Sequence, residues 1–249
     1  MKDFIAGEDR LLLARHGLDN FAALWALQLP AVDEPNTERG GWSSVCRLEL
    51  EDRAYYLKRQ RNHLTRSLRH PLGEPTFARE LRNIQRYQAL KIPALSAAFY
   101  AERRLDGDRC AILLTHALDG WRDLNDWLDD WASLPGVEQR AILRACGELI
   151  RRLHGARQMH GCLYPKHIFL RREADGFRAC LIDLEKTRPF WLAQRDRIKD
   201  LETLLRRSAR SWGDKDLRVL LGFYLDEFER LDQWSARLAA RHSDKANRR

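Results

Sequence analysis

The sequence predicts an α+β fold in which a strand-rich first half of the chain is followed by a helical second half. Short apolar runs separated by turn residues are frequent before residue 116. After residue 122 the apolar residues recur mainly at helical spacing, with one short pair of strands between the helices. A doubly wound sheet is not expected, because its strands and helices would alternate through both halves.

The elements of the first half follow from local patterns. Apolar residues spaced by three or four along residues 77–90 form one face of an amphipathic helix that carries Glu80. The other expected elements, in chain order, are two short helices within 9–29, a loop over 33–41, a hairpin of strands 45–50 and 54–60, a basic loop over 61–69, and a second pair of strands, 97–105 and 109–115, around the turn 106–108.

The second half begins after a polar connector at residues 116–122. Residues 136–156 carry a helical apolar stripe, turn-forming residues at 174–176 join two short strands, and at least two helices follow from residue 196. Three segments are therefore expected: an N-lobe with an N-terminal extension over 1–116, a helical C-lobe over 117–242, and a frayed basic tail over 243–249.

Composition narrows the function classes. A hydrophobic content of 44% excludes a disordered chain. The net charge of +8 favours a partner that carries phosphates or carboxylates, such as a nucleotide, a nucleic acid or anionic lipid headgroups. The five cysteines form no Cys-x-x-Cys pair, so free thiols in a reducing cytosol are expected. The sequence shows neither a membrane-spanning stretch nor a signal-peptide core, so any membrane contact is expected to be peripheral.

The most informative stretch is H-G-C-L-Y-P-K-H at residues 160–167, followed by an apolar run that ends at Asp183. Protein kinases carry H-R-D-L-x-x-x-N, a strand and then D-F-G in this order. In that pattern one Asp accepts the proton of the acceptor hydroxyl, and the Asn and the second Asp hold magnesium. Here His160 and Asp183 match, Cys162 takes the place of the base, and His167 takes the place of the Asn. The pattern indicates a bilobal protein-kinase-like fold.

A lysine and a glutamate stand upstream of this loop in the order that kinases use. Lys58 lies in the second strand of the first hairpin, from which a lysine can reach the α- and β-phosphates of a nucleotide. Glu80, on the next helix, is its expected ion-pair partner. A lysine on an edge strand usually faces solvent, so each residue alone is ordinary. Their order relative to the later motifs makes them candidate nucleotide-binding residues.

The segment from Gly40 to Ser44 is a candidate turn over the phosphates. Gly40 and Gly41 permit close backbone approach, and Ser43 and Ser44 follow them. The segment matches neither G-x-G-x-x-G nor the P-loop pattern. A plain entry into the hairpin is the alternative.

Asp183 is the first candidate metal ligand. It ends an apolar strand, where a carboxylate needs a partner, and a magnesium ion meets that need. A solvent-facing acid at the strand end is the alternative. His167 is the second candidate ligand, although imidazole suits magnesium poorly.

Cys162, His160, Lys166 and His167 are the candidate catalytic residues. A thiol with an unperturbed pKa of about 8.5 is mainly neutral at physiological pH and lacks the fixed charge of the usual base. Losing a general base lowers a rate by about 10² to 10⁴, yet phosphoryl transfer depends mainly on positioning and electrostatics. Two alternatives for Cys162 are an unreactive buried residue and the nucleophile of a Cys/His hydrolase, for which no oxyanion-hole context is recognisable. The spacing of His154, His160 and His167 is not that of a zinc site.

A cluster of arginine and histidine at residues 59–70 is a further candidate site, for the phosphates of an acceptor. A solvated basic loop is the alternative. Aromatic side chains are not interleaved with these charges, which disfavours nucleic acid.

Together, these segments resemble the lipopolysaccharide kinase family of the Kdo/WaaP type, and most closely its InaA branch. The resemblance covers nearly the whole chain. The segments that carry it are YYLKRQ at 55–60, TFAREL at 76–81, the loop and strand at 160–170, LIDLEK at 181–186 and KDL at 199–201.

The resemblance implies an ATP-dependent kinase that uses Mg²⁺ and phosphorylates heptose or Kdo in the inner core of lipopolysaccharide, on the cytoplasmic side of the inner membrane. It implies that Lys58 and Glu80 bind the nucleotide phosphates, that Asp183 binds Mg²⁺, and that residues 160–167 form the acceptor site. A histidine in the Asn position is similar to the WaaP branch, whereas Cys162 departs from the active members.

The expected partner is therefore the lipopolysaccharide core or another anionic envelope glycolipid, and the expected location is the cytoplasm, with peripheral contact at the inner membrane. The alternative is a pseudokinase or regulatory nucleotide-binding module that lacks efficient catalysis because Cys162 replaces the usual Asp. A nucleic-acid-binding protein is a third and less favoured class.

Overall fold

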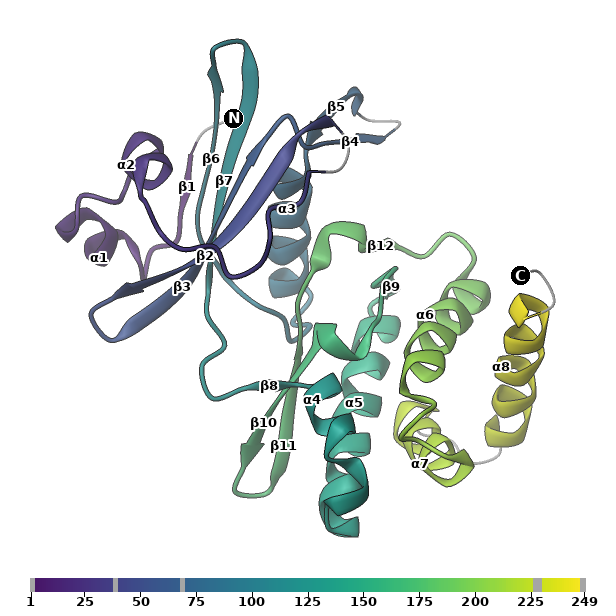
Figure 1. Ribbon diagram of the computed structural model, residues 1–249. Helices are drawn as coiled ribbons and strands as arrows, with labels where there is room; N and C mark the ends of the chain where they lie inside the picture. Colours follow the sequence, from purple (N-terminus) through teal and green to yellow (C-terminus); the bar gives the residue numbers. More distant parts are fainter. Residues whose placement is uncertain (1–2, 38–39, 68–69, 226–229, 247–249) are drawn as a thin grey trace. The chain divides into compact units, whose positions relative to one another are not determined.

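The computed structural model describes residues 3–37, 40–67, 70–225 and 230–246. The chain divides into two compact units, which are residues 1–88 with 95–119, and residues 89–94 with 120–249. Strands dominate the first unit and helices the second (Figure 1). The predicted α+β, kinase-like order of elements is therefore present.

An antiparallel sheet forms the centre of the first unit, with the strand order β1-β6-β7-β3-β2. Both predicted hairpins are present, and Glu51 and Asp106 adopt left-handed backbone conformations in their turns. The first hairpin extends further than predicted mainly at its open end, where residues 42–44 pair with residues 59–61. The strands are β1 (Phe4–Ile5), β2 (Trp42–Leu50), β3 (Arg53–Arg61), β6 (Ala97–Leu105) and β7 (Asp108–His116).

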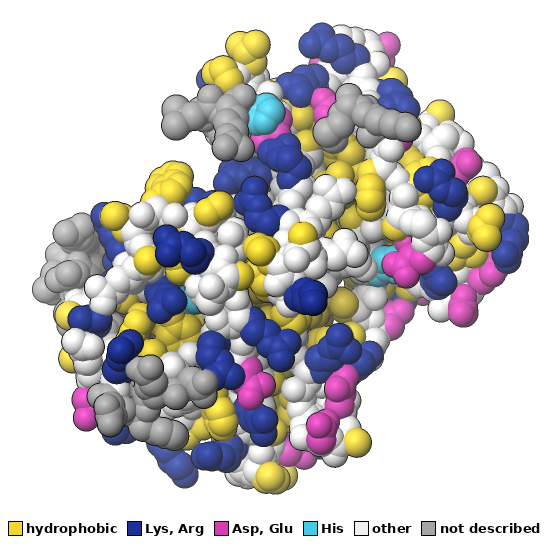
Figure 2. All heavy atoms as spheres, turned by 180° about the vertical axis from the view of Figure 1, so that it is seen from behind, with side chains coloured by type: hydrophobic (Ala, Val, Ile, Leu, Met, Phe, Trp, Pro, Cys, Tyr) yellow, Lys and Arg dark blue, Asp and Glu magenta, His cyan; other side chains and the backbone are white. Residues whose placement is uncertain are grey.

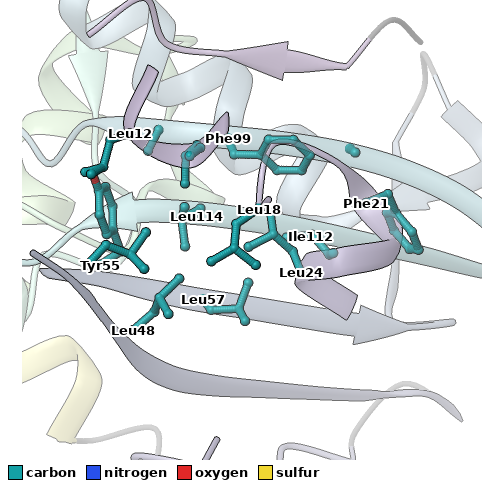
Figure 3. Packing of buried hydrophobic residues seen from close by; sticks show 14 of the residues in the cluster. Leu12, Leu18, Phe21, Leu24, Leu48, Tyr55, Leu57, Phe99, Ile112 and Leu114 are labelled. Carbon is teal, nitrogen blue, oxygen red and sulfur yellow. The ribbon is translucent and has the colours of Figure 1, made fainter. Parts of the chain in front are cut away.

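Two short helices, α1 (Arg10–Arg15) and α2 (Phe21–Ala26), supply apolar side chains to the core of this unit, as predicted. The helix α2 begins at Asn20, whose side chain accepts a hydrogen bond from the Ala23 N–H at 3.0 Å. Figure 3 shows Leu12, Leu24 and Phe21 of these helices packed against alternate residues of the strands. These buried contacts fix the sheet that carries Lys58.

The prediction of a basic loop over residues 61–69 is wrong at residues 61 and 64–67, and residues 68–69 lie outside the described residues. The strand β3 runs to Arg61, and β4 (Leu64–Ser67) then pairs with β5 (His70–Pro75) in a two-stranded ribbon. Prolines and a glycine at 71–75 suggest a loop, but proline is tolerated on an edge strand, where its missing N–H breaks no ladder. The ribbon leads into the predicted amphipathic helix, α3 (Thr76–Ala89).

The second unit is built on the long helix α5, whose predicted apolar stripe is buried. Gly147 of α5 lets α7 approach closely, because a Cβ at this position would lie 2.8 Å from the Leu220 carbonyl oxygen. The helices are α4 (Leu124–Asp129), α5 (Gly136–Gly155), α6 (Ala193–Ser208), α7 (Asp214–Leu225) and α8 (Leu231–Ala246), with short 3-10 turns η2 (Trp131–Ser133), η3 (Pro165–His167) and η4 (Leu184–Lys186).

Short strand pairs lie on either side of the motif at residues 160–167. The strand β10 (Ile168–Glu173) pairs with β11 (Gly176–Leu181) and with β8 (Arg122–Asp123). The strand β9 (Gln158–Met159) pairs with β12 (Arg188–Pro189). The motif is thereby held at both ends.

The C-terminal tail begins later than predicted. The helix α8 runs to Ala246, so residues 243–246 are helical and the remainder of the predicted tail, 247–249, lies outside the described residues. Among the described helices, none is long and apolar enough to cross a membrane. Lys and Arg side chains are scattered among other side chains over the face shown in Figure 2.

Candidate functional site

Lys58 and Glu80 form a buried ion pair in the first unit. The Lys58 Nζ lies 2.6 Å from Glu80 Oε1, and the two side chains are only 18% and 5% exposed. Lys58 is in β3, which is an interior strand with β2 and β7 on its two sides, so the expectation for an edge-strand lysine does not apply. The pair holds the ammonium group in place through one of its three N–H donors, among the contacts of the described residues.

Gln60 positions the helix that carries Glu80. Its side chain lies on the same face of β3 as Lys58 and is fully buried. Its Oε1 accepts hydrogen bonds from Thr76 Oγ1 at 2.8 Å and from the Phe77 N–H at 3.0 Å, at the start of α3. Glu80 follows one turn later, so Gln60 sets the position from which it meets Lys58.

The glycine segment enters β2 as part of the sheet. The Ser43 N–H donates to the Asn36 carbonyl oxygen at 2.8 Å, so strand pairing already uses this N–H, and Ser44 stands opposite Arg59 in the same ladder. A Cβ on Gly41 would overlap the backbone at residues 61–63, which explains the glycine by chain packing alone. Gly40 has φ +72°. A phosphate-covering role for Gly40, Gly41, Ser43 and Ser44 stays a prediction.

Asp200 anchors the loop of residues 160–167 in the second unit. It lies in the buried face of α6, and its side chain is 1% exposed. Its Oδ2 accepts from the His160 N–H at 2.7 Å and its Oδ1 from the Gly161 N–H at 2.9 Å. His154 contacts the same carboxylate at 3.4 Å, and burial lowers the pKa of His154. The carboxylate fixes the start of the loop through its backbone.

Backbone carbonyls fix the tautomers of both loop histidines. His160 Nε2 lies 2.9 Å from the Ile182 carbonyl oxygen, and His167 Nδ1 lies 2.9 Å from the Cys162 carbonyl oxygen. A carbonyl only accepts, so both of these ring nitrogens are donors. The other nitrogen of His160 faces the Cys162 thiol at 3.6 Å, and that of His167 faces Asp183 at 3.3 Å.

Asp183 occupies the turn after β11 in a left-handed conformation, with φ 56° and ψ 63°. Such a backbone costs about 1–3 kcal/mol for a residue other than glycine and is common at functional sites. Its Oδ2 lies 3.3 Å from His167 Nε2 and 4.0 Å from Cys162 Sγ, and its side chain is 43% exposed. The structure thus brings together Asp183, His160, Cys162 and His167, as the motif predicts.

The charge states of the loop follow from burial. Cys162 is 2% exposed, and burial, followed by the nearby Asp183 carboxylate, raises the pKa of its thiol to about 12. Burial also lowers the pKa of His167. The thiol is therefore protonated at neutral pH and cannot act as the general base, and a neutral ring is favoured for His167.

The remaining predicted residues are exposed or form contacts within their own unit. Lys166 is exposed, in the turn η3. In the basic segment, Arg59 donates to the carbonyl oxygens of Trp25 and Leu27, and Arg61 pairs with Asp108 at 2.5 Å. These two arginines serve the packing of the first unit, which weakens the prediction of an acceptor site there. All five cysteines are buried free thiols, as expected.

Asp183 is suited to a magnesium ion, and its neighbours are not. One or two carboxylates are sufficient protein ligands for Mg²⁺, which keeps several waters and takes phosphate oxygens as its other ligands. The nitrogen of His167 and the sulfur of Cys162 are softer donors that favour other metals. Asp183 as the Mg²⁺ ligand stays a prediction, and ligand chemistry disfavours His167 for that role.

Comparison with known proteins shows the family of this chain. The chain matches the model of the lipopolysaccharide kinase (Kdo/WaaP) family over residues 22–224. Protein InaA of Escherichia coli (strain K12) is 31% identical over 172 residues, which are 68% of this chain and 79% of the relative. The lipopolysaccharide core heptose(I) kinase WaaP of Pseudomonas aeruginosa is 27% identical over 229 residues, 85% of this chain and 76% of the relative.

A solved structure described as WaaP in complex with acyl carrier protein superposes with a TM-score of 0.72 at 25% identity, covering 98% of this chain and 99% of that chain. The fold, the loop of residues 160–167 and Asp183 therefore define a protein of the kinase-like class. The chain belongs to the lipopolysaccharide kinase (Kdo/WaaP) family.

Proposed function

We propose that this chain binds ATP and transfers the γ-phosphoryl group to a heptose or Kdo of the lipopolysaccharide inner core, or to a related envelope acceptor. The observation that carries the proposal is the buried Lys58–Glu80 ion pair, because protein kinases need such a pair in place to bind the nucleotide phosphates. Membership of a family of lipopolysaccharide kinases supports the class of acceptor.

The roles follow the order of the motifs. Lys58 binds the α- and β-phosphates, and Glu80 keeps its ammonium group in position. Asp183 would hold a metal ion, and such an ion would supply positive charge beside the phosphoryl group. Asp200 holds the backbone at His160 and Gly161, and so fixes the loop that includes the acceptor site.

Cys162 makes the proposed enzyme slow. A protonated thiol accepts no proton from the acceptor hydroxyl, and the missing general base lowers the rate by about 10² to 10⁴. Positioning and charge stabilisation remain, and they supply most of the catalysis in phosphoryl transfer. The proposal therefore includes weak turnover by the wild-type chain.

The acceptor places the proposed reaction at the cytoplasmic face of the inner membrane, where the lipopolysaccharide core is completed. The net charge of +8 supports peripheral contact with anionic headgroups.

Transfer of labelled γ-phosphate from ATP to purified inner-core fragments tests the proposal. We expect acceptor-dependent labelling by the wild type that falls to background in Asp183→Asn. Asp175→Asn, in the exposed turn between β10 and β11, is the matched control and should keep the wild-type rate. Labelling that is independent of Asp183, or absent with every core fragment while ATP still binds, would refute the proposed transfer.

If ATP binds but no core fragment is labelled, the result would favour another function, a regulatory nucleotide-binding module. The observation that favours it is the buried and protonated thiol in the position of the base. Such a module would hold nucleotide through Lys58 without turnover.

A further inference from the structure

Three buried side chains of the loop bring their ligand atoms together. The ligand atoms of His160, Cys162 and His167 all lie within 4.8 Å of one another. Cys162 Sγ is 3.6 Å from His160 Nδ1, and Asp183 Oδ2 is 3.3 Å from His167 Nε2 and 4.0 Å from the sulfur. Two nitrogens, one sulfur and one carboxylate oxygen therefore converge in one place.

Each ring has one nitrogen held by a backbone carbonyl and one nitrogen directed at the cluster. His167 Nδ1 lies 2.9 Å from the Cys162 carbonyl oxygen, and its Nε2 faces Asp183 Oδ2 at 3.3 Å. His160 Nε2 lies 2.9 Å from the Ile182 carbonyl oxygen, and its Nδ1 faces Cys162 Sγ at 3.6 Å. Imidazole nitrogen, thiolate sulfur and carboxylate oxygen are the ligands that Zn²⁺ takes in proteins, so a cation between these atoms would contact all four groups.

We propose that His160, Cys162 and His167, with Asp183 as the fourth ligand, form a binding site for a divalent transition-metal ion of the Zn²⁺ class. Tetrahedral Zn²⁺ with Zn–S of about 2.3 Å and Zn–N of about 2.0–2.1 Å places sulfur and nitrogen about 3.6 Å apart, and nitrogen and oxygen about 3.3 Å apart. The observed separations of 3.6 Å and 3.3 Å agree with this, and the sulfur-to-oxygen distance of 4.0 Å needs only a small shift of the exposed Asp183.

The surroundings of the ligands are those of a metal site. Histidine ligands in proteins usually donate the other ring N–H to a carbonyl or carboxylate, which orients the ring. The Ile182 and Cys162 carbonyls do this for His160 and His167. The nitrogen and sulfur ligands are buried, while the 43% exposed side chain of Asp183 provides the route by which an ion enters. Cys162 loses its proton to solvent when the ion binds, because the thiolate is the ligand.

This site goes beyond the proposed kinase function and does not depend on it. Mg²⁺ prefers oxygen ligands, so it does not fill a set of two nitrogens and one sulfur. Asp183 takes part in both sites, and the Zn²⁺-class ion and the Mg²⁺ of the nucleotide therefore exclude each other. Occupancy of the new site would hold the protein in a state that is inactive in phosphotransfer.

Titration of the full-length, reduced, metal-free protein with Co²⁺, in the absence of nucleotide, tests the site. Co²⁺ takes the place of Zn²⁺ in such sites, and its absorption spectrum depends on the ligands and their geometry. We expect one equivalent to give the visible bands of tetrahedral Co²⁺ and the near-ultraviolet band of a cobalt–thiolate bond. Zn²⁺ should abolish both bands, and a large excess of Mg²⁺ should leave them unchanged.

Two variants and one control assign the ligands. Cys162→Ala should lose the thiolate band, and His167→Asn should bind Co²⁺ at least about 10-fold more weakly. Cys146→Ala, at another buried cysteine on α5, should behave as the wild type. If Cys162→Ala does not fold by circular dichroism, the His167→Asn result decides. Absence of stoichiometric binding by the wild type, or a thiolate band that depends on Cys146 and not on Cys162, would overturn the proposal.

Discussion

The carboxylate of Asp200 binds the backbone N–H of His160 at 2.7 Å, across 40 residues of sequence. The same side chain holds the next N–H, that of Gly161, and is almost fully buried. The shape of the loop at residues 160–167 therefore depends on a side chain that lies outside the H-G-C-L-Y-P-K-H motif.

Asp200→Ala should destabilise the protein by about 3–5 kcal/mol, because two buried N–H groups lose hydrogen bonds to a charged acceptor. Urea unfolding measures the change. Asp232→Ala is the control, since Asp232 forms an exposed ion pair with Arg218, and its loss should change the free energy of unfolding by less than about 1 kcal/mol. Equal effects of the two substitutions would show that Asp200 does not anchor the loop.

Gly161→Ala should destabilise the protein by more than the cost of placing alanine in a left-handed backbone conformation. Gly161 has φ +83°, and a Cβ there would lie 2.7 Å from the Lys186 carbonyl oxygen. Gly107 has φ +88° with nothing within 4 Å of a Cβ, so Gly107→Ala measures the conformational cost alone, about 1–2 kcal/mol. The thermal midpoint should fall further for Gly161→Ala than for Gly107→Ala. The reverse order would contradict the close contact with Lys186.

Acid should destabilise the second unit through Asp196. Burial opposes ionisation of this side chain, but hydrogen bonds from Arg188 and from two backbone N–H groups prevail and lower its pKa to about 2. A carboxyl with a lowered folded-state pKa stabilises the fold above its unfolded pKa of about 4, and this contribution is lost as the pH falls from about 4 to 2. The amount is about 2 kcal/mol.

The free energy of unfolding of the wild type and of Asp196→Asn, measured against pH, checks this expectation. The difference between the two proteins should be largest at neutral pH and should shrink below about pH 4. A difference that is constant down to about pH 2 would show that Asp196 has no lowered pKa.

Lys58→Met should weaken binding of Mg-ATP by about 10- to 100-fold, because a charge-assisted contact with phosphate contributes about 1.5–3 kcal/mol. Isothermal titration calorimetry gives the affinity. Lys215→Met, at an exposed lysine of α7, is the control and should bind as the wild type does. Unchanged affinity in Lys58→Met would remove Lys58 from the nucleotide site.

The sequence predicted those elements in which apolar residues recur at a regular spacing. The stripe of α5 and the hairpin β2–β3 are examples, since periods of 3.6 and 2 residues show which face is buried. The ribbon β4–β5 was predicted as a loop because its prolines and glycine are typical of loops, and only its pairing partner makes it a strand.

The site was predicted where it follows a linear motif and missed where it depends on tertiary contacts. The order of Lys58, Glu80 and Asp183 is visible in the sequence. Gln60 and Asp200 stand in segments that carry the family resemblance, but they act through partners 16 to 40 residues away, and those contacts were not predicted. The usual spacing of zinc ligands applies to residues that are close in sequence. It did not reveal the cluster of His160, Cys162 and His167 with Asp183, because folding brings the loop and the end of a strand together.

The most direct test of the kinase proposal is the rate of phosphate transfer by Cys162→Asp compared with the wild type, with Mg-ATP and inner-core fragments and with transition metals removed. A carboxylate at this position restores the general base while Lys58, Glu80 and Asp183 keep their places. The proposal predicts unchanged ATP affinity and a higher rate, by an appreciable part of the range of about 10² to 10⁴ that general bases provide. A rate that stays at background while ATP binds, or a wild-type rate that Cys162→Asp abolishes, would contradict it.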